Sequence, residues 1–155
     1  MEIKVSQTIN KPIAEVWEVM GNQFGHAHKW SSNFKSSKPG GTEKFKGLAY
    51  SLRDTETDRG NTIQELTEFD ALNHSLTYVI TKGAPDIAKQ AGATWTLIQQ
   101  SENITSLAMN FNLEPKMELP KEMEDKIKMG LTSSVQELAA ELKYYLENGK
   151  AQLNK

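Results

Sequence analysis

The sequence predicts an α+β fold in which a curved antiparallel sheet of seven strands is covered by two short helices and one long C-terminal helix. Three observations predict this fold. Apolar and polar residues alternate near the start, several further alternating segments are separated by turn residues, and apolar residues recur at three- and four-residue steps from position 123 to 145. A sheet with one apolar face needs a cover, and the terminal helix is long enough to provide it.

The first elements are a strand and two short helices. Alternation of Ile3, Val5 and Ile9 with polar neighbours predicts a half-buried strand over residues 3–9. Pro12 suits the first turn of a helix, and apolar residues at positions 13, 16, 17 and 20 follow at helical spacing until Gly21. A second helical turn is expected over residues 24–28.

The middle of the chain is predicted to be β-structure. Residues 30–37 are interpreted as a loop that passes into a short strand. Proline and glycine at positions 39–41 indicate a turn, and a strand over residues 45–52 with a bulge at Gly47 is expected to bend the sheet. The polar run 54–61 is interpreted as a hairpin loop, and residues 82–91 as a longer loop. The remaining strands are expected at residues 62–69, 75–81, 93–100 and 104–112.

The last element is a long amphipathic helix of about 28 residues from position 120, with acidic residues in its first turn. Asn148 and Gly149 are expected to end it. No change of composition indicates a second domain, so residues 1–149 are predicted to form one domain and residues 150–155 a frayed tail. A single helix does not fill the hollow of a curved sheet, and this mismatch predicts a pocket between them.

Composition excludes several classes of function. The chain has 155 residues, a formal net charge of −2 and no cysteine. Nucleic-acid binders carry a basic face, so a nucleic-acid partner is not expected. Disulfides and thiolate metal sites are excluded. No uninterrupted apolar run of 18 residues is present, so no stable membrane insertion is expected. We predict a cytoplasmic protein.

Several segments together resemble a known superfamily. They are residues 5–17 (VSQTINKPIAEVW), 24–25 (FG), 28–30 (HKW), 62–66 (TIQEL), 69–70 (FD) and 76–78 (LTY). Their order and spacing are similar to those of the START-like, Bet v 1-like (SRPBCC) superfamily, in particular its bacterial polyketide cyclase/dehydrase-like branch. The resemblance covers nearly the whole chain and implies the helix-grip fold, with an internal cavity for a small hydrophobic molecule.

The resemblance also has departures. The plant hormone receptors of this fold carry a pocket lysine directly after the position of Trp30, where this chain has Ser31, and their gate sequence is absent from residues 51–60. Many bacterial relatives carry an arginine three residues after the glycine that matches Gly47, where this chain has Tyr50. A carboxylate hormone bound as in those receptors is therefore not expected.

The candidate site residues are large apolar or small side chains at inward positions, together with one carboxylate. Glu65 shares strand parity with Ile63, and its family counterpart points into the pocket, where an apolar environment would raise the pKa of a carboxyl group. Its alternative interpretation is a solvated carboxylate without chemistry. The predicted ligand-binding residues are Trp30, Phe34, Tyr50, Ile63, Glu65, Tyr78, Trp95, Met109, Phe111, Ile127, Gly130, Leu131 and Ser134.

Three functions remain open at this point. The first is binding of a lipid, polyketide or aromatic metabolite in the cavity. The second is a cyclase- or dehydratase-type enzyme with Glu65 as acid–base group and Tyr78 as hydrogen-bond donor. The third is a protein-interaction module, with exposed apolar side chains at residues 82–91 or a homodimer face. No cofactor is expected. The three histidines, His26, His28 and His74, lack the spacing of a metal site, so no metal is expected either.

Overall fold

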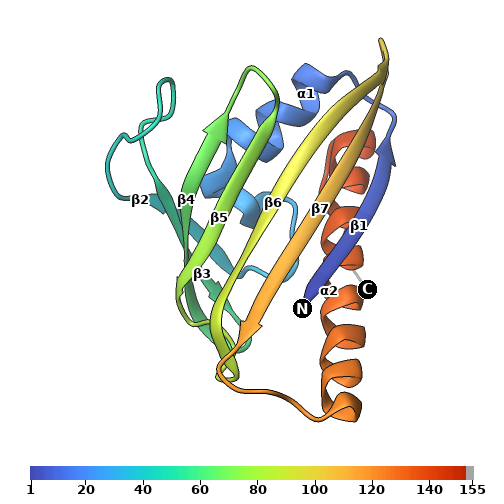
Figure 1. Cartoon of the computed structure of the whole chain (residues 1–155). Helices are drawn as coiled ribbons and strands as arrows, with labels where there is room; N and C mark the ends of the chain where they lie inside the picture. The colour runs from blue at the N-terminus through green and yellow to red at the C-terminus, as the bar shows by residue number, and fades with distance from the viewer. Residues whose placement is uncertain (153–155) are drawn as a thin grey trace.

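The computed structural model describes residues 1–152 as one seven-stranded antiparallel sheet with helices on its concave side (Figure 1). The strand order is β1-β7-β6-β5-β4-β3-β2. The strands are β1 (Glu2–Ile9), β2 (Ser36–Gly40), β3 (Leu52–Thr57), β4 (Gly60–Asp70), β5 (Ser75–Lys82), β6 (Ala88–Ser101) and β7 (Ile104–Pro115). The helical segments are α1 (Ile13–Trp17), η1 (Glu18–Asn22), η2 (Phe24–Lys29) and α2 (Lys121–Asn148).

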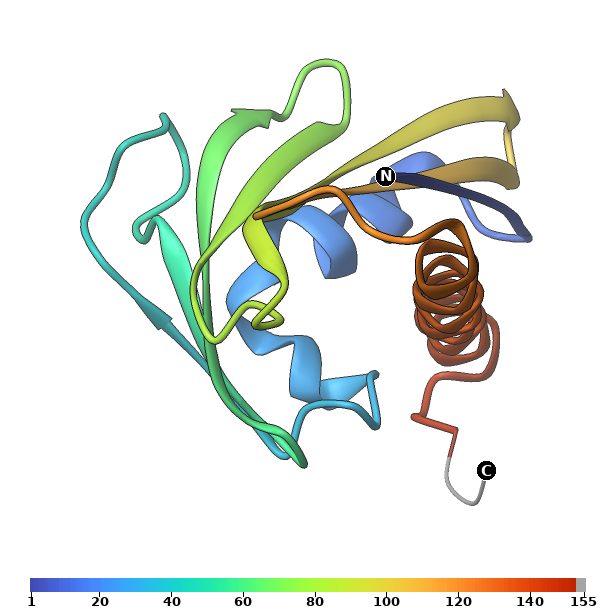
Figure 2. The same cartoon turned by 60° about the horizontal axis from the view of Figure 1, so that its bottom comes forward.

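The sheet bends around two groups of helices. Figure 2 shows α1, η1 and η2 inside the curve of the sheet, with α2, seen nearly end-on, beside β1. This arrangement confirms the predicted fold class, including seven strands, two short helical regions and a long C-terminal helix. The N-terminal helical segments occupy one part of the concavity and α2 crosses the other part, so the space between them and the strands is where a cavity can form.

The first strand and helices follow the predicted pattern closely. Ile3, Val5 and Ile9 of β1 are buried, and β1 pairs with β7. Pro12 precedes α1 with φ of −59°, as expected for a residue that introduces a helix. The helix does not simply end at Gly21, because residues Glu18–Asn22 continue it as a π-helical turn, and η2 is a 3₁₀ segment.

The predicted elements between residues 36 and 61 need correction. Pro39 and Gly40, expected in a turn, belong to β2. This strand lies at the edge of the sheet and pairs on one side only, so it tolerates a residue without an N–H donor. Residues 45–51 do not form a strand, and Leu52 is the first residue of β3. Only an isolated bridge joins Phe45 to Leu48, and both side chains pack on the core. The strand β3 ends inside the polar run 54–61, which is therefore a loop only at residues 58 and 59.

The later strands and the terminal helix agree with the prediction in position and extend beyond it at their ends. β6 begins at Ala88, inside the segment that was predicted to be a loop. α2 has 28 residues and ends at Gly149, whose φ of 74° is the left-handed conformation typical of a residue after a helix. Residues 153–155 of the predicted tail lie outside the described residues. No helix in the described part of the chain has the length and apolar character needed to cross a membrane.

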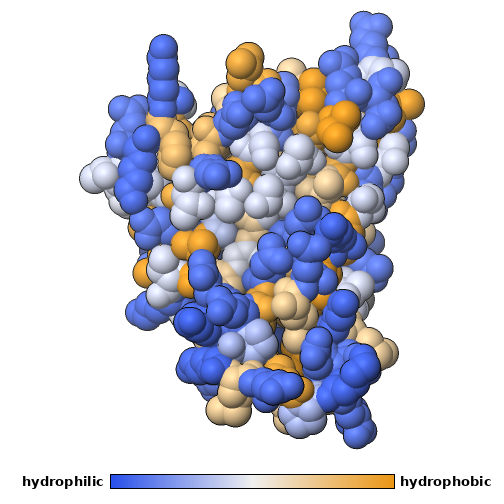
Figure 3. Space-filling view, viewed as in Figure 1, coloured by the Kyte–Doolittle hydropathy of each residue, from blue (hydrophilic) through white to orange (hydrophobic). Residues whose placement is uncertain are grey.

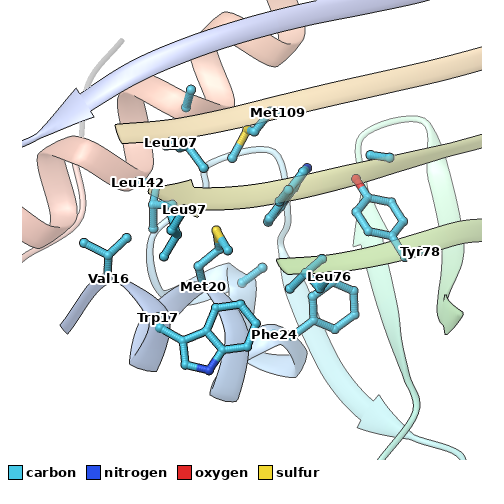
Figure 4. Packing of buried hydrophobic residues seen from close by; sticks show 14 of the residues in the cluster. Val16, Trp17, Met20, Phe24, Leu76, Tyr78, Leu97, Leu107, Met109 and Leu142 are labelled. Carbon is cyan, nitrogen blue, oxygen red and sulfur yellow. The ribbon is translucent and has the colours of Figure 1, made fainter. Parts of the chain in front are cut away.

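The main core lies between the sheet and the N-terminal helices. Figure 4 shows Val16, Trp17, Met20 and Phe24 facing Leu76, Leu97 and Leu107 of the sheet, with Leu142 of α2 beside them. From α2, Ala139 and Leu142 are fully buried, whereas most residues of its N-terminal half are exposed. The two halves of α2 therefore differ in role. The C-terminal half closes the core, and the N-terminal half lies over a less tightly packed region.

Candidate functional site

A cavity of about 150 Å³ lies between α2 and the strands β4 to β7. Its wall is largely apolar, and the polar side chains on it are two amides and two hydroxyls. Seven of the residues on this wall were predicted from the sequence, namely Phe34, Tyr78, Trp95, Met109, Phe111, Leu131 and Ser134. The remaining five are Asn33, Gln64, Ala93, Val135 and Leu138. Inward positions of β5, β6 and β7 thus meet one face of α2 at this cavity.

A groove on the surface continues the cavity toward solvent. It measures about 410 Å³ and shares Leu131 and Ser134 with the cavity. Ile127 and Gly130, predicted as ligand-binding residues, lie in this groove rather than on the inner wall. The side chain that alanine would add at Gly130 meets no atom within 4 Å, so this position of the groove is open space. The exposed half of α2 therefore borders both the groove and the cavity.

Arg53 lies buried against the cavity wall, with 1% of its surface exposed. Its Nε donates a hydrogen bond of 2.7 Å to Oε1 of Gln64, and its Nη1 donates one of 3.1 Å to the carbonyl oxygen of Phe24. Its Nη2 has no hydrogen-bond partner among the described residues. Buried polar atoms in native proteins almost always have partners, so this atom needs an explanation.

Aromatic rings surround the Arg53 guanidinium. Its central carbon lies 3.9 Å from the ring centre of Phe24 and between 5.3 and 5.4 Å from the rings of Phe34, Tyr78 and Trp95. The last three rings also line the cavity. The faces of aromatic rings carry partial negative charge and attract a cation at these distances. Among the described residues no carboxylate accepts a hydrogen bond from Arg53. The rings therefore help to stabilise its charge in place of an ion pair.

Arg53 remains a cation at neutral pH. Burial lowers the pKa of Arg53 to about 10, and the nearby hydroxyl groups of Tyr78 and Tyr50 act in the opposite direction. Burial also raises the pKa of Tyr78, an effect that Arg53 partly offsets. At pH 7 the site therefore combines a positive guanidinium with a neutral phenol. This combination favours a ligand group that accepts hydrogen bonds.

Glu65 does not reach the cavity, contrary to the prediction. Its carboxylate forms an ion pair of 2.6 Å with Lys44 at the surface. Along β4 the residues facing inward are Gln64 and Leu66, both buried, and Glu65 pairs with Leu52 of β3 and Val79 of β5. The prediction chose the other face because it placed the apolar Ile63 inward. Here the inward face is polar, since Thr55 and Arg53 of β3 are both buried.

Three other predicted residues also lie away from the cavity wall. Trp30 is buried in the core, with its ring 6.4 Å from that of Trp95. The hydroxyl of Tyr50 accepts a hydrogen bond of 2.8 Å from the amide of Gly25 and donates one of 2.9 Å to the carbonyl oxygen of Asn22, so it holds the helical segments in place. Ile63 is paired with Asp54 and shares the outward face with Glu65.

The most informative residue that the sequence analysis missed is Arg53, together with its partner Gln64. Both belong to the β3–β4 pair, where they lie directly opposite each other. The alternation of Arg53 and Thr55 with Leu52, Asp54 and Glu56 has the period of a strand, but its inward residues are polar. A search for polar alternation, and not only for apolar alternation, would have found it.

The histidines do not form a metal centre in the structure. The rings of His26 and His28 lie 6.2 Å apart, and His74 packs edge-on against Trp17 at 5.6 Å. Within residues 1–152, no three histidine or carboxylate side chains lie where they would share one metal ion.

Comparison with known proteins agrees with this architecture. A family model described as "Polyketide cyclase / dehydrase and lipid transport" matches residues 1–147. The chain belongs to this family. Polyketides and lipids, the molecules named in the family description, are largely hydrophobic, which agrees with an apolar cavity of this kind. No curated protein sequence matches the chain significantly.

Solved structures of family-like proteins share the fold at low sequence identity. A START superfamily protein from Mycobacterium smegmatis is 12% identical with a TM-score of 0.78, and 96% of this chain covers 99% of that chain. The protein XoxI from Bacillus cereus is 19% identical with a TM-score of 0.74 over 95% of this chain and 96% of that one. The di-domain ARO/CYC BexL from the BE-7585A biosynthetic pathway is 13% identical with a TM-score of 0.75, over 95% of this chain and 46% of that one.

Proposed function

We propose that this member of the polyketide cyclase/dehydrase and lipid transport family binds a small hydrophobic molecule between the sheet and α2. The observation that carries the proposal is the apolar cavity of about 150 Å³ behind Leu131 and Ser134. A hydrophobic ligand that covers this apolar wall would be stabilised by about 25 cal/mol per Å² of apolar surface removed from water.

The size of the cavity limits the ligand. A cavity of about 150 Å³ accommodates a molecule about as large as benzene, so one aromatic ring or a short aliphatic chain fits inside. The groove of about 410 Å³ that shares Leu131 and Ser134 with it offers room for the rest of a longer molecule. A lipid, a polyketide or an aromatic metabolite would therefore place one end in the cavity and extend along α2.

A pair of neighbouring serines on α2 provides the test. Ser134 lies at both the cavity and the groove, whereas Ser133 lies in a surface hollow on the side facing solvent. Ser134→Leu should block the entrance and weaken binding of a neutral aromatic probe, cinnamamide, at least about tenfold. Ser133→Leu adds the same side chain and should leave binding unchanged. Equal binding of cinnamamide by both variants would count against this site.

Native mass spectrometry of the protein purified from its own host tests the proposal without a chosen probe. We expect a co-purified small molecule that is lost on denaturation and is absent from Ser134→Leu protein purified in the same way. A mass equal to that of the protein alone, combined with no thermal shift across a library of lipids, polyketides and aromatic acids, would contradict the proposal. The same spectra report the oligomeric state, and so test the homodimer expected as one alternative.

The two alternative functions lack a supporting observation. The acid–base pair required for the enzyme is not formed, because Glu65 faces Lys44 outside the sheet while Tyr78 lies at the cavity. In the segment 82–91, Ile87 is half-buried and Ala88 is buried, so this loop offers no large apolar surface. Figure 3 shows apolar side chains scattered among hydrophilic ones on the face that it presents. We retain the cytoplasm as the expected compartment because the chain has no cysteine.

A further inference from the structure

A buried cation lies directly behind one part of the cavity wall. The guanidinium of Arg53 contacts Gln64, Phe34, Tyr78 and Trp95, and all four of these residues line the cavity. None of the twelve residues on the cavity wall is a carboxylate or a lysine. Arg53 is therefore a formal charge placed behind a wall whose own side chains are all neutral.

The hydrogen bonds of Arg53 leave its charge without an anionic partner. Its Nε bonds to a neutral amide and its Nη1 to a backbone carbonyl. Hydrogen bonding with the Tyr78 side chain raises the pKa of Arg53 against the effect of burial. Its Nη2, which carries two N–H donors, nevertheless has no acceptor at full hydrogen-bond geometry among the described residues. A buried charge is ordinarily paired with an opposite charge, and hydrogen bonds from a guanidinium to an anion are about twice as strong as those between neutral groups.

We propose that the ligand is a hydrophobic acid whose carboxylate binds the Nη2 of Arg53 while its ring or chain fills the apolar cavity. This inference rests on the proposed function and specifies the ligand class for the same site. The aromatic rings of Phe34, Tyr78 and Trp95 hold the guanidinium in place before the ligand enters, so little order is lost on binding. The neutral hydroxyl of Tyr78 provides a second donor on the cavity wall.

The cation comes from β3, where Arg53 lies opposite Gln64 of β4. A carboxylate bound to its Nη2 would therefore lie toward the β3–β4 pair.

The test compares an acid with its neutral isostere. For the wild-type protein, isothermal titration calorimetry should give cinnamate an affinity at least about tenfold higher than cinnamamide. Arg53→Met should weaken cinnamate binding at least about tenfold and change cinnamamide binding by less than about threefold. Lys38→Met removes the same charge from an exposed position of β2 and should alter neither affinity.

The possible outcomes separate this inference from the proposed function. Equal affinity of the wild-type protein for the acid and the amide, or equal losses of both in Arg53→Met, contradicts the carboxylate anchor and leaves the hydrophobic site standing. Failure of both probes and of the native ligand search contradicts both proposals. Blocking by Ser134→Leu combined with an acid preference that depends on Arg53 supports both.

A second measurement avoids the substitution, in case Arg53→Met does not fold. The chain contains only two arginines, Arg53 and Arg59. Selective ¹⁵N-arginine labelling therefore gives two side-chain Nε signals in NMR spectra of the wild-type protein. Cinnamate should shift the signal of Arg53 and cinnamamide should shift it far less. An Arg53 signal that stays unchanged at saturating cinnamate would overturn the inference.

Discussion

Arg53 and Gln64 lie directly opposite each other on β3 and β4, and the Arg53 Nε donates a hydrogen bond of 2.7 Å to the Gln64 Oε1 inside the protein. Both side chains are buried. The pair fixes the direction of a charged group behind a cavity wall whose side chains are all neutral. Substitutions in this pair are therefore expected to change both the stability of the protein and its affinity for a ligand.

Gln64→Leu should destabilise the protein by about 1.5–3 kcal/mol, because it removes the acceptor from a charged donor that remains buried. The free energy of unfolding from urea titrations measures this loss. The double variant Arg53→Met/Gln64→Leu replaces both partners by apolar groups and should regain most of the stability. A double variant less stable than Gln64→Leu would contradict this account.

Glu65→Gln should change the unfolding free energy by less than about 1 kcal/mol, because the ion pair with Lys44 is partly exposed to solvent. It should also leave ligand affinity unchanged, since the carboxylate faces away from the cavity. Calorimetry with cinnamate and a urea titration check both statements. A large loss of affinity would restore the hypothesis that Glu65 acts inside the pocket.

Gly130→Ala should stabilise the protein by about 0.5–1 kcal/mol, because alanine loses less backbone entropy in a helix and its side chain meets no atom here. Gly149→Ala provides the opposite control. Gly149 has a φ of 74° and its amide bonds to the carbonyl oxygen of Tyr145, so alanine would be strained at that position. Thermal unfolding should give shifts of opposite sign for the two variants.

Glu147→Gln should destabilise the protein at neutral pH. Burial raises the pKa of Glu147, but hydrogen bonds from the Asn10 amide and Lys143 outweigh it, and the net effect lowers this pKa below its ordinary value. A lowered pKa stabilises the fold above the ordinary glutamate pKa of about 4.3 and loses that contribution as the pH falls below it.

Urea titrations at several pH values check this dependence on Glu147. The stability difference between the wild-type protein and Glu147→Gln should be full at pH 7 and shrink as the pH falls below about 4. A difference that stays constant from neutral to acid pH would show that the carboxylate charge plays no part in joining α2 to the β1–α1 connection.

Apolar patterning in the sequence predicts most of the fold because most of the sheet buries an apolar face. The strands β4 to β7 and the helix α2 agree with the prediction for this reason, and six of the seven predicted residues of the cavity wall lie on them. The same rule failed at β3. There the inward residues include Arg53 and Thr55, so the strand has the composition of a loop.

The candidate site depends on this exception. Inward polar residues on a strand predict a buried site only if side chains from distant segments surround them. Phe24, Phe34 and Trp95 surround Arg53 in this way. These residues come from three separate parts of the chain, and single-strand alternation contains no information on how they meet. The inward direction predicted for Glu65 is wrong for the same reason, because it was inferred from the apolar Ile63 on the same face of the strand.

The pairing of β1 with β7 has a consequence for how the chain matures on the ribosome. Glu2 pairs with Asn112 and Ile9 with Thr105, so β1 cannot form these pairs until β7 has been synthesised. Such distant pairings slow folding, because a long loop must close before they form. The nascent chain therefore exposes the apolar side of β1 throughout most of translation, and chaperones that bind short apolar segments would meet it there.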